Sequence, residues 1–341
     1  MKITNVVWGF VLIIPPVALA TFRFNVGTDY NSYIRLYNML KGYNPVEFAR
    51  IFVADIMAQE PLWYLTNRAA FLLFDSEIGM FFLSSLIMII FVVLGIRYFA
   101  RHISFGYALF VFFMLHYNMS FNAVRTLIAA SIIFYALRYI LERNLFKYFV
   151  FILLATAFHR TALLAILFYL VIPVQNRTLG IMKRYSYYFL ILLTPIVLAL
   201  ALRIARMIPI FDKYFYKYSV SSFGLGAGFL IYVLPFLTPI LFLKNKISKI
   251  DNRYSVLVDA ALFHLPLRYL GYFTEYGHRV EVYISMIYIV LIPLSIRSLR
   301  YLPSRVGLTL YYTGVLLFYY IYTYIILLGH ETYPFYFISG F

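Results

Sequence analysis

Long apolar stretches occupy most of this chain, and few charged residues interrupt them. Apolar residues make up 64% of the 341 residues and charged residues 12%, and the mean hydropathy is +0.84. Soluble domains contain about a quarter charged residues, so the composition excludes a soluble fold and predicts a membrane protein with many spans. The stretches are 6–22, 78–96, 104–118, 123–141, 147–158, 161–173, 186–202, 229–243, 255–270, 280–296 and 306–328, with a weaker one at 61–74.

The spans are predicted to be helices, because a segment in lipid must satisfy its backbone hydrogen bonds internally. We therefore expect an all-α fold of about 11–12 transmembrane helices, in a single integral domain over residues 1–341. Several stretches are shorter than the roughly 20 residues of a full span, which indicates short or re-entrant helices. The total is 12 if 61–74 crosses the membrane and 11 if, as we favour, it is a re-entrant or surface helix.

Positive charges indicate which of the loops between these stretches are cytoplasmic. The net charge of +16 does not indicate nucleic-acid binding, because Lys and Arg gather near span ends, as the positive-inside rule predicts for cytoplasmic loops. Loops 23–60 and 203–228 are then expected outside. Since both ends of 147–173 are assigned to the inside, this segment should form two short helices with an outer turn at 158–161. The basic loops are 97–101, 138–147, 177–184, 244–253 and 297–305.

Cations on the predicted outer side are the first candidates for a binding site. An arginine at one position can simply snorkel to the headgroups, but the positive-inside rule predicts few cations there. A guanidinium grips phosphate with two hydrogen bonds and stays charged when desolvated. The set consists of Arg23, Arg125, Arg160, Arg203, Arg206, Arg268 and Arg279, with His159 and His278.

Other chemistry has less support in the sequence. The chain has no cysteine, which excludes thiol catalysis and disulfides. No His, Asp or Glu residues show metal-ligand spacing, and no glycine-rich phosphate loop precedes a helix, so no metal and no cofactor are predicted. Asp259 interrupts an apolar stretch, where a structural pair with an arginine or a tyrosine hydroxyl is the favoured reading.

Several motifs together resemble the EpsG family of Wzy-type polysaccharide polymerases. The run RFNVGTDYNSY at 23–33, which contains Asp29, Tyr30 and Tyr33, resembles the family's opening motif. Four further features are similar to later motifs of the family. They are Glu60 before an aromatic segment, Arg125 at a helix start, LLATAFHRTALLAI around His159, and HRVEVYISMIYIVLIPLSI from His278. Position 126 is Thr where family members often have Gln. The resemblance extends over about 23–295.

The resemblance implies a multi-pass enzyme of the bacterial inner membrane with a GT-C-like fold and its site facing the periplasm. Such a polymerase transfers a growing glycan from undecaprenyl diphosphate to a new lipid-linked repeat unit, which builds O-antigen or exopolysaccharide. The implied partners are undecaprenyl-diphosphate-linked oligosaccharide, membrane lipid, a chain-length regulator and a flippase, with no nucleic acid. A flippase or an O-antigen ligase-like transferase is the alternative function, although a transporter should show internal repeats and none is evident.

The implied reaction assigns roles to the candidate residues. We hypothesise a metal-independent inverting transfer in which Arg125, Arg160 and Arg279 hold the diphosphate leaving group. His159 is the candidate base or a donor to the diphosphate, and Glu60 and Asp29 are alternative bases or orient the cations. The remaining candidates for substrate binding are Arg23, Tyr30, Tyr33, Arg203, Arg206 and His278.

Overall fold

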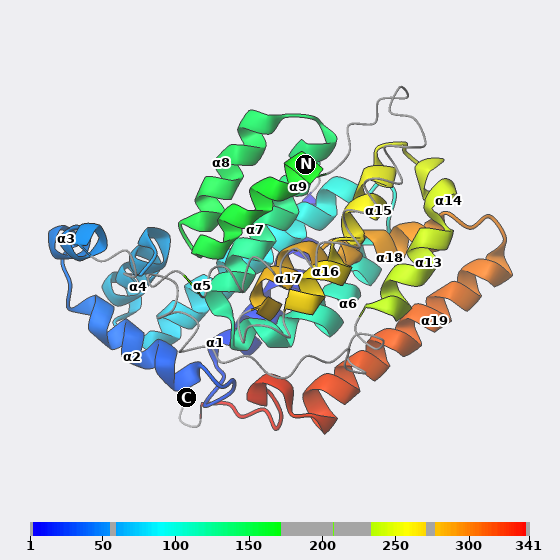
Figure 1. Ribbon diagram of the computed structural model, residues 1–341. Helices are drawn as coiled ribbons and strands as arrows, with labels where there is room; N and C mark the ends of the chain where they lie inside the picture. Colours follow the sequence, from blue (N-terminus) through cyan, green and yellow to red (C-terminus); the bar gives the residue numbers. More distant parts are fainter. Residues whose placement is uncertain (1–2, 55–58, 172–206, 208–232, 271–276, 339–341) are drawn as a thin grey trace. The chain divides into compact units, whose positions relative to one another are not determined.

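The computed structural model describes residues 3–54, 59–171, 207, 233–270 and 277–338 (Figure 1). Within these ranges the chain is mostly helical, and β structure is limited to one isolated antiparallel bridge between Arg23 and Phe337. The predicted all-α fold is confirmed.

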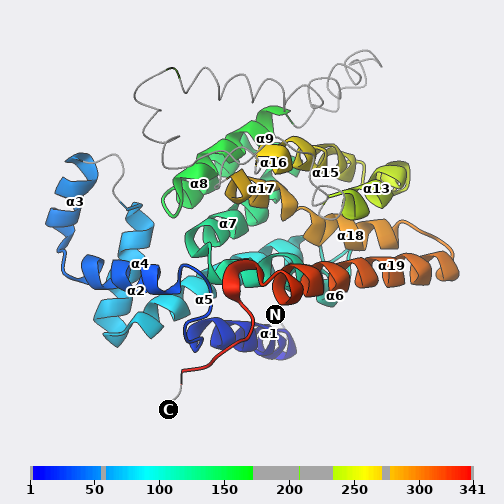
Figure 2. The same ribbon diagram turned by 60° about the horizontal axis from the view of Figure 1, so that its bottom comes forward.

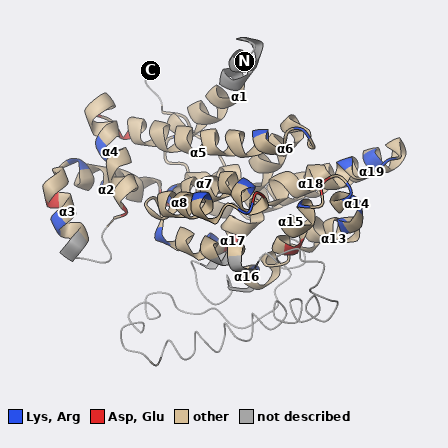
Figure 3. Ribbon diagram, turned by 90° about the horizontal axis from the view of Figure 1, so that it is seen from above, with Lys and Arg blue, Asp and Glu red and all other residues tan. Residues whose placement is uncertain are grey.

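Four of the described helices are long and apolar enough to cross a membrane. In Figure 3 the helical ribbons are tan over most of their length, with Lys and Arg confined to a few bands. The protein is therefore a polytopic membrane protein. The four are Glu77–Phe99 (α5), Val124–Leu141 (α7), Arg279–Arg297 (from α17, Gly277–Ser285, and α18, Tyr288–Arg297) and Leu302–Ile326 (α19, Leu302–Tyr320, continued by η4, Ile321–Ile326).

Shorter apolar helices accompany these spans at Leu12–Thr21, Phe105–Phe121 and Leu145–Thr156. The predicted total of about 11–12 spans and the GT-C-like arrangement stay predictions, because 172–206 and 208–232 lie outside the described residues. The membrane side of every loop, including 23–60 and 203–228, also stays a prediction.

The chain divides into two compact units. Unit 1 contains Met1–Arg101, Leu109–Ala165 and Leu316–Phe341, and unit 2 contains His102–Ala108 and Ile166–Val315. The single integral domain predicted over 1–341 stays a prediction.

Helix α7 forms the centre of unit 1. It packs against α5 and against α8 (Leu145–Thr156), and α8 runs beside α7 in both Figure 1 and Figure 2. Nearly all of α7 is buried. A Cβ at Gly95 of α5 would lie 2.5 Å from the Phe134 ring of α7, so the absence of a side chain there lets the two helices approach closely. This packing fixes the start of α7, where Arg125 lies.

Four further helices complete the N-terminal part of unit 1. Helices α1 and α4 pack against α5, and α2 packs against α4. The bounds are α1, Ile3–Thr21; α2, Tyr30–Lys41; α3, Pro45–Ala54; and α4, Pro61–Phe74. Residues 61–74 thus form a helix of 14 residues, and whether it enters the membrane stays a prediction.

The segment 147–173 contains the break that the charge pattern predicts. Helix α8 ends at Thr156, a 3-10 helix follows at Arg160–Ala165 (η3), and α9 begins at Ile166 and ends at Val171. A single long helix is therefore wrong and the predicted turn is confirmed, with His159 just before η3. The position of this turn on the outer side stays a prediction.

Unit 2 contains α9, four short helices, and α17 and α18. The short helices are α13, Leu234–Phe242; α14, Lys244–Ser248; α15, Tyr254–Ala261; and α16, His264–Leu270. Asp259 of α15 forms an ion pair with Lys244 of α14. The structural pair predicted for Asp259 is thus confirmed, although its partner is a lysine rather than an arginine or tyrosine.

Candidate functional site

The Glu60 carboxylate lies at the centre of a buried polar cluster in unit 1. Its Oε2 accepts a hydrogen bond from Arg125 Nη1 at 2.6 Å, and its Oε1 accepts one from His159 Nδ1 at 3.1 Å. The backbone N–H of Arg160 also donates to Oε1, at 3.3 Å. Arg125 Nη1 donates in addition to Gln59 Oε1 at 2.8 Å. We call these five residues the Glu60 cluster.

The start of α4, the start of α7 and the turn after α8 bring the Glu60 cluster together. Glu60 is the N-cap residue of α4, yet its side chain does not cap that helix and is directed to the cluster instead. The backbone N–H of Leu62 donates to the carbonyl of Ala157 at 2.9 Å, which joins the start of α4 to the turn after α8. Arg125 is the second residue of α7. The cluster therefore rests on backbone contacts as well as on ion pairs.

The electrostatics of the Glu60 cluster fix the charge of Glu60. The side chain is 6% exposed, and burial alone disfavours a charged carboxylate. The hydrogen bond from His159, the positive charge of Arg125 and, when His159 is protonated, the positive charge of that ring outweigh this burial and lower the pKa of Glu60 to about 2. Glu60 is thus ionised at neutral pH, and a carboxylate with so low a pKa is a weak base.

Tyr33 extends the Glu60 cluster toward α2. Its hydroxyl forms a hydrogen bond with Arg125 and also interacts with it electrostatically. Its ring packs edge-on against Trp63, with 5.6 Å between the ring centroids. Tyr30, one turn earlier, instead stacks on Phe81 of α5 at 5.2 Å and is buried. Of the two predicted tyrosines, Tyr33 therefore lies at the cluster, whereas the Tyr30 ring packs against α5.

Arg23 has a different environment from Arg125. It is 2% exposed, and its guanidinium donates to the carbonyls of Ala20 and Phe121 at 3.3 and 3.2 Å. The cation also lies over the rings of Phe81 and Phe121, at 4.2 and 5.0 Å. These contacts fasten the end of α1 to the segment before α7, a positioning role that sequence reasoning did not foresee. Binding of substrate by Arg23 stays a prediction.

The loop that follows Arg23 is fixed through Asn122. Asn122 Oδ1 accepts from the Thr28 hydroxyl at 2.6 Å and from the backbone N–H of Asp29 at 2.8 Å. Its amide nitrogen lies 3.0 Å from His330 Nδ1. Sequence reasoning missed both residues. Asn122 lies three residues before Arg125 in NMSFNAVRTL, which was a usable signal, whereas His330 had none.

The backbone conformation and surroundings of Gly27 explain why this loop needs a glycine. Its φ is +99°, a conformation that side chains rarely adopt. A Cβ there would lie 2.9 Å from the carbonyl oxygen of Phe121. The glycine of the GTDY motif therefore allows the loop to lie directly against the segment that leads into α7.

A sequence model of the EpsG family matches residues 6–337, nearly the whole chain. This protein belongs to the EpsG family. The family contains Wzy-type polysaccharide polymerases, which gives the chain a general role in polysaccharide polymerisation. No curated protein and no solved structure matches the chain.

Four predicted site residues of this EpsG-family member lie elsewhere or outside the described structure. Arg279 is half-buried in the first turn of α17, in unit 2. His278 precedes it in the same helix, but its side chain lies outside the described part of the chain. Arg203 and Arg206 fall within 172–206, also outside the described residues. Their predicted roles stay predictions.

Unit 2 holds a second buried carboxylate cluster, of which the sequence had singled out only Arg268. Glu281 Oε1 accepts from His264 Nε2 at 2.6 Å, and Oε2 accepts from Arg268 Nη1 at 3.0 Å. The other ring nitrogen of His264 lies 2.9 Å from the Tyr288 hydroxyl. His264 and Glu281 are far apart in sequence and show no motif spacing. In the described parts of both units, no group of three or more acidic or histidine residues could hold a metal ion.

Proposed function

We propose that this EpsG-family protein polymerises undecaprenyl-diphosphate-linked oligosaccharide repeat units by a metal-independent inverting transfer. The observation that carries the proposal is the Glu60 cluster, in which a buried carboxylate holds a histidine and an arginine together. The proposed setting is the bacterial inner membrane, with the site facing the periplasm. A flippase delivers the substrate there, and a chain-length regulator acts on the product.

In this proposal His159 is the general base. A carboxylate can only accept hydrogen bonds, so its contact with Nδ1 assigns the ring proton to that nitrogen in neutral His159. Nε2 then carries the lone pair. The arrangement matches the carboxylate–histidine pair of hydrolytic triads, in which the acid orients the base and is not itself protonated. Glu60 is accordingly a positioning residue, consistent with its low pKa.

The proposed step moves one proton and breaks one bond. The hydroxyl of the acceptor sugar attacks the anomeric carbon of the donor glycan and forms the new glycosidic C–O bond. The hydroxyl proton passes to His159 Nε2. The bond between the anomeric carbon and the phosphate oxygen breaks, and undecaprenyl diphosphate leaves with the electron pair. Direct attack from the opposite face inverts the anomeric centre.

Arginines neutralise the leaving group in this proposal. The side-chain amide oxygen of Gln59 and the carboxylate of Glu60 both accept from Arg125 Nη1, which fixes the guanidinium at the start of α7. A fixed cation that faces developing negative charge lowers the barrier without reorganisation. Arg160 follows His159 directly and shares the proposed role. For Arg279, contact with the diphosphate stays a prediction from the sequence.

The test is polymerisation by purified protein supplied with lipid-diphosphate-linked repeat units, with gel analysis of the glycan. We expect a ladder from the native protein and a rate lower by about two to four orders of magnitude in His159→Gln. The matched control is His102→Gln in unit 2, where a histidine contacts Tyr254 at 2.7 Å; this variant should keep the ladder. Native protein that moves repeat units across vesicles without joining them would show a flippase. Transfer of finished glycan to a lipid core would show a ligase.

A further inference from the structure

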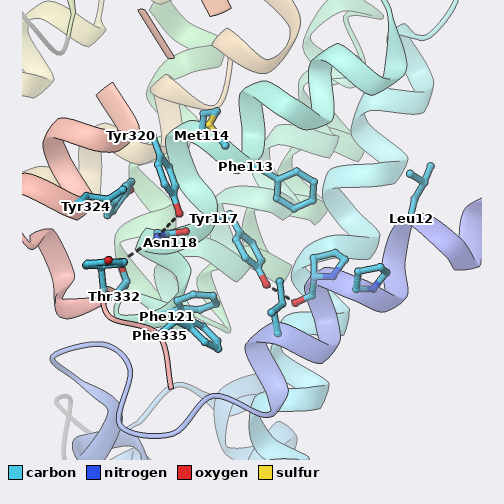
Figure 4. A pocket seen from close by; sticks show the side chains of 15 residues that line it. Leu12, Phe113, Met114, Tyr117, Asn118, Phe121, Tyr320, Tyr324, Thr332 and Phe335 are labelled. Atoms are coloured by element: carbon cyan, nitrogen blue, oxygen red, sulfur yellow. Dashed lines mark hydrogen bonds between the residues drawn. The ribbon is translucent and has the colours of Figure 1, made fainter. Parts of the chain in front are cut away.

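A pocket of about 610 Å³ lies in unit 1. Its volume is in the range of ligand-binding cavities in proteins, about 300–1,000 Å³. Figure 4 shows it bounded by α1 on one side, by the end of α19 and the C-terminal segment on the other, and by the segment before α7. The lining residues come from four separate segments of the chain, so the pocket is a product of the tertiary fold.

Both π-helical segments that the structure describes line this pocket, which we call the π-helix pocket. One is η1 (Phe113–Tyr117) and the other is η4. π-Helical turns are rare and occur frequently at functional sites, because they disturb the regular hydrogen-bond ladder of a helix. The Tyr324 hydroxyl of η4 donates to the carbonyl of Leu115 in η1 at 3.4 Å, so the two segments are linked directly.

The walls of the π-helix pocket favour a hydrocarbon ligand. None of its lining residues is charged, which argues against a diphosphate. Its main polar group, the Asn118 amide, already donates to Thr332 Oγ1 at 3.1 Å and to the Tyr320 hydroxyl at 3.3 Å. A sugar would need a partner for each of its hydroxyls, whereas these groups satisfy one another. Aromatic rings such as Phe113, Phe121 and Phe335 provide the rest of the surface (Figure 4).

Part of the lining is exposed, which allows entry from the bilayer. Leu19 of α1, Ile325 of η4 and Tyr333 of the C-terminal segment are 39%, 38% and 52% exposed. Exposed apolar side chains of a membrane protein can face lipid without cost, because the surroundings are equally apolar. A chain already in the bilayer would therefore reach the pocket without crossing water.

The π-helix pocket and the Glu60 cluster lie on the same short stretch of chain. Asn118 and Phe121 line the pocket in η2 (Asn118–Phe121), and Arg125 enters the cluster at the start of α7. An isoprenoid diphosphate joins an apolar chain directly to an anionic group, so its site needs both kinds of surface close together. We propose that the π-helix pocket binds the part of the isoprenoid chain next to the diphosphate of the lipid-linked substrate. This inference rests on the proposed function.

Binding of lipid by purified protein in detergent tests the proposal, with native mass spectrometry as the readout. The probes are undecaprenyl phosphate and dioleoyl phosphatidylglycerol. The variants Met114→Trp and Ile325→Trp each place an indole ring in the pocket, from two different walls. Each variant should bind undecaprenyl phosphate about tenfold more weakly, since loss of even a methylene-sized contact in an apolar pocket lowers affinity about 10-fold or more. Leu72→Trp, at a position of α4 that is 67% exposed, is the matched control and should bind normally.

Three outcomes would overturn the pocket assignment. The first is normal binding of undecaprenyl phosphate by both pocket variants, when thermal unfolding shows that they are folded. The second is equally weakened binding in Leu72→Trp. The third is equal binding of the two lipids by the native protein. The polymerase proposal fails separately, if native protein makes no glycan ladder. In the polymerisation assay, the pocket variants should raise KM for the lipid-linked repeat with kcat nearly unchanged, whereas His159→Gln should lower kcat.

Discussion

Replacing Glu60 by glutamine should uncouple the Glu60 cluster while keeping its volume. The amide has one acceptor oxygen where the carboxylate has two, so it cannot accept from both Arg125 Nη1 and His159 Nδ1 as the carboxylate does. The variant therefore leaves a buried cation without its counter-charge, which is a larger penalty than loss of a surface pair.

The structure sets the size of the expected change. A fall in the pKa of Glu60 from 4.5 to about 2 corresponds to about 3 kcal/mol of stability at neutral pH. The side chain is 6% exposed, so solvent screening reduces this little. The figure agrees with the roughly 3–5 kcal/mol typical of breaking a buried pair from one side. Because the folded pKa is lowered, the contribution is complete above about pH 4.5 and is lost as the pH falls toward 2.

Thermal unfolding in detergent, measured between pH 7 and pH 3, checks this expectation. Glu60→Gln should unfold at a temperature several degrees below the native protein at pH 7, and the difference should shrink in acid. Polymerisation should fall by about three to four orders of magnitude, because His159 loses the group that sets its tautomer. Glu142→Gln, at an exposed position after α7, is the control. Equal unfolding temperatures at pH 7 for Glu60→Gln and the native protein would refute the reasoning.

Four other expectations can be measured independently. Polymerisation should survive EDTA because arginines neutralise the diphosphate; complete loss with rescue by magnesium would contradict this. Arg279→Ala should leave only unpolymerised repeats at normal protein level, and Arg279→Lys should be impaired because lysine cannot grip two oxygens; normal glycan length in Arg279→Ala would remove it from the site. Gly27→Ala should lower the unfolding temperature, with stability reduced by more than about 1 kcal/mol, whereas Gly42→Ala, with φ of −71°, should not. A cysteine at Arg160 should react with an impermeant thiol reagent from outside and one at Arg143 should not; the reverse pattern would discard the predicted turn orientation.

The hydrophobic pattern was sufficient to predict the class of fold. Backbone groups in lipid must bond within their own segment, so long apolar stretches can only be helices. The charge pattern placed the break at 158–161, because both ends of 147–173 are basic, and the structure confirms this break between α8 and η3. It also indicated that Asp259 needs a partner, because an isolated charge in an apolar stretch is costly. Each of these signals is contained in a short run of sequence.

Only the tertiary structure decided which polar residues meet. Glu60, Arg125 and His159 were separate candidates in sequence, and their convergence depends on how α4, α7 and α8 pack. Arg23 carried the same local signal as Arg125 but is enclosed by Phe81 and Phe121. Arg23 follows the apolar stretch 6–22 and Arg125 lies at the start of the stretch 123–141, so along the chain both look like cations at the end of a span. Their roles differ because contacts between distant segments determine which cation is covered by aromatic rings and which is paired with a buried carboxylate.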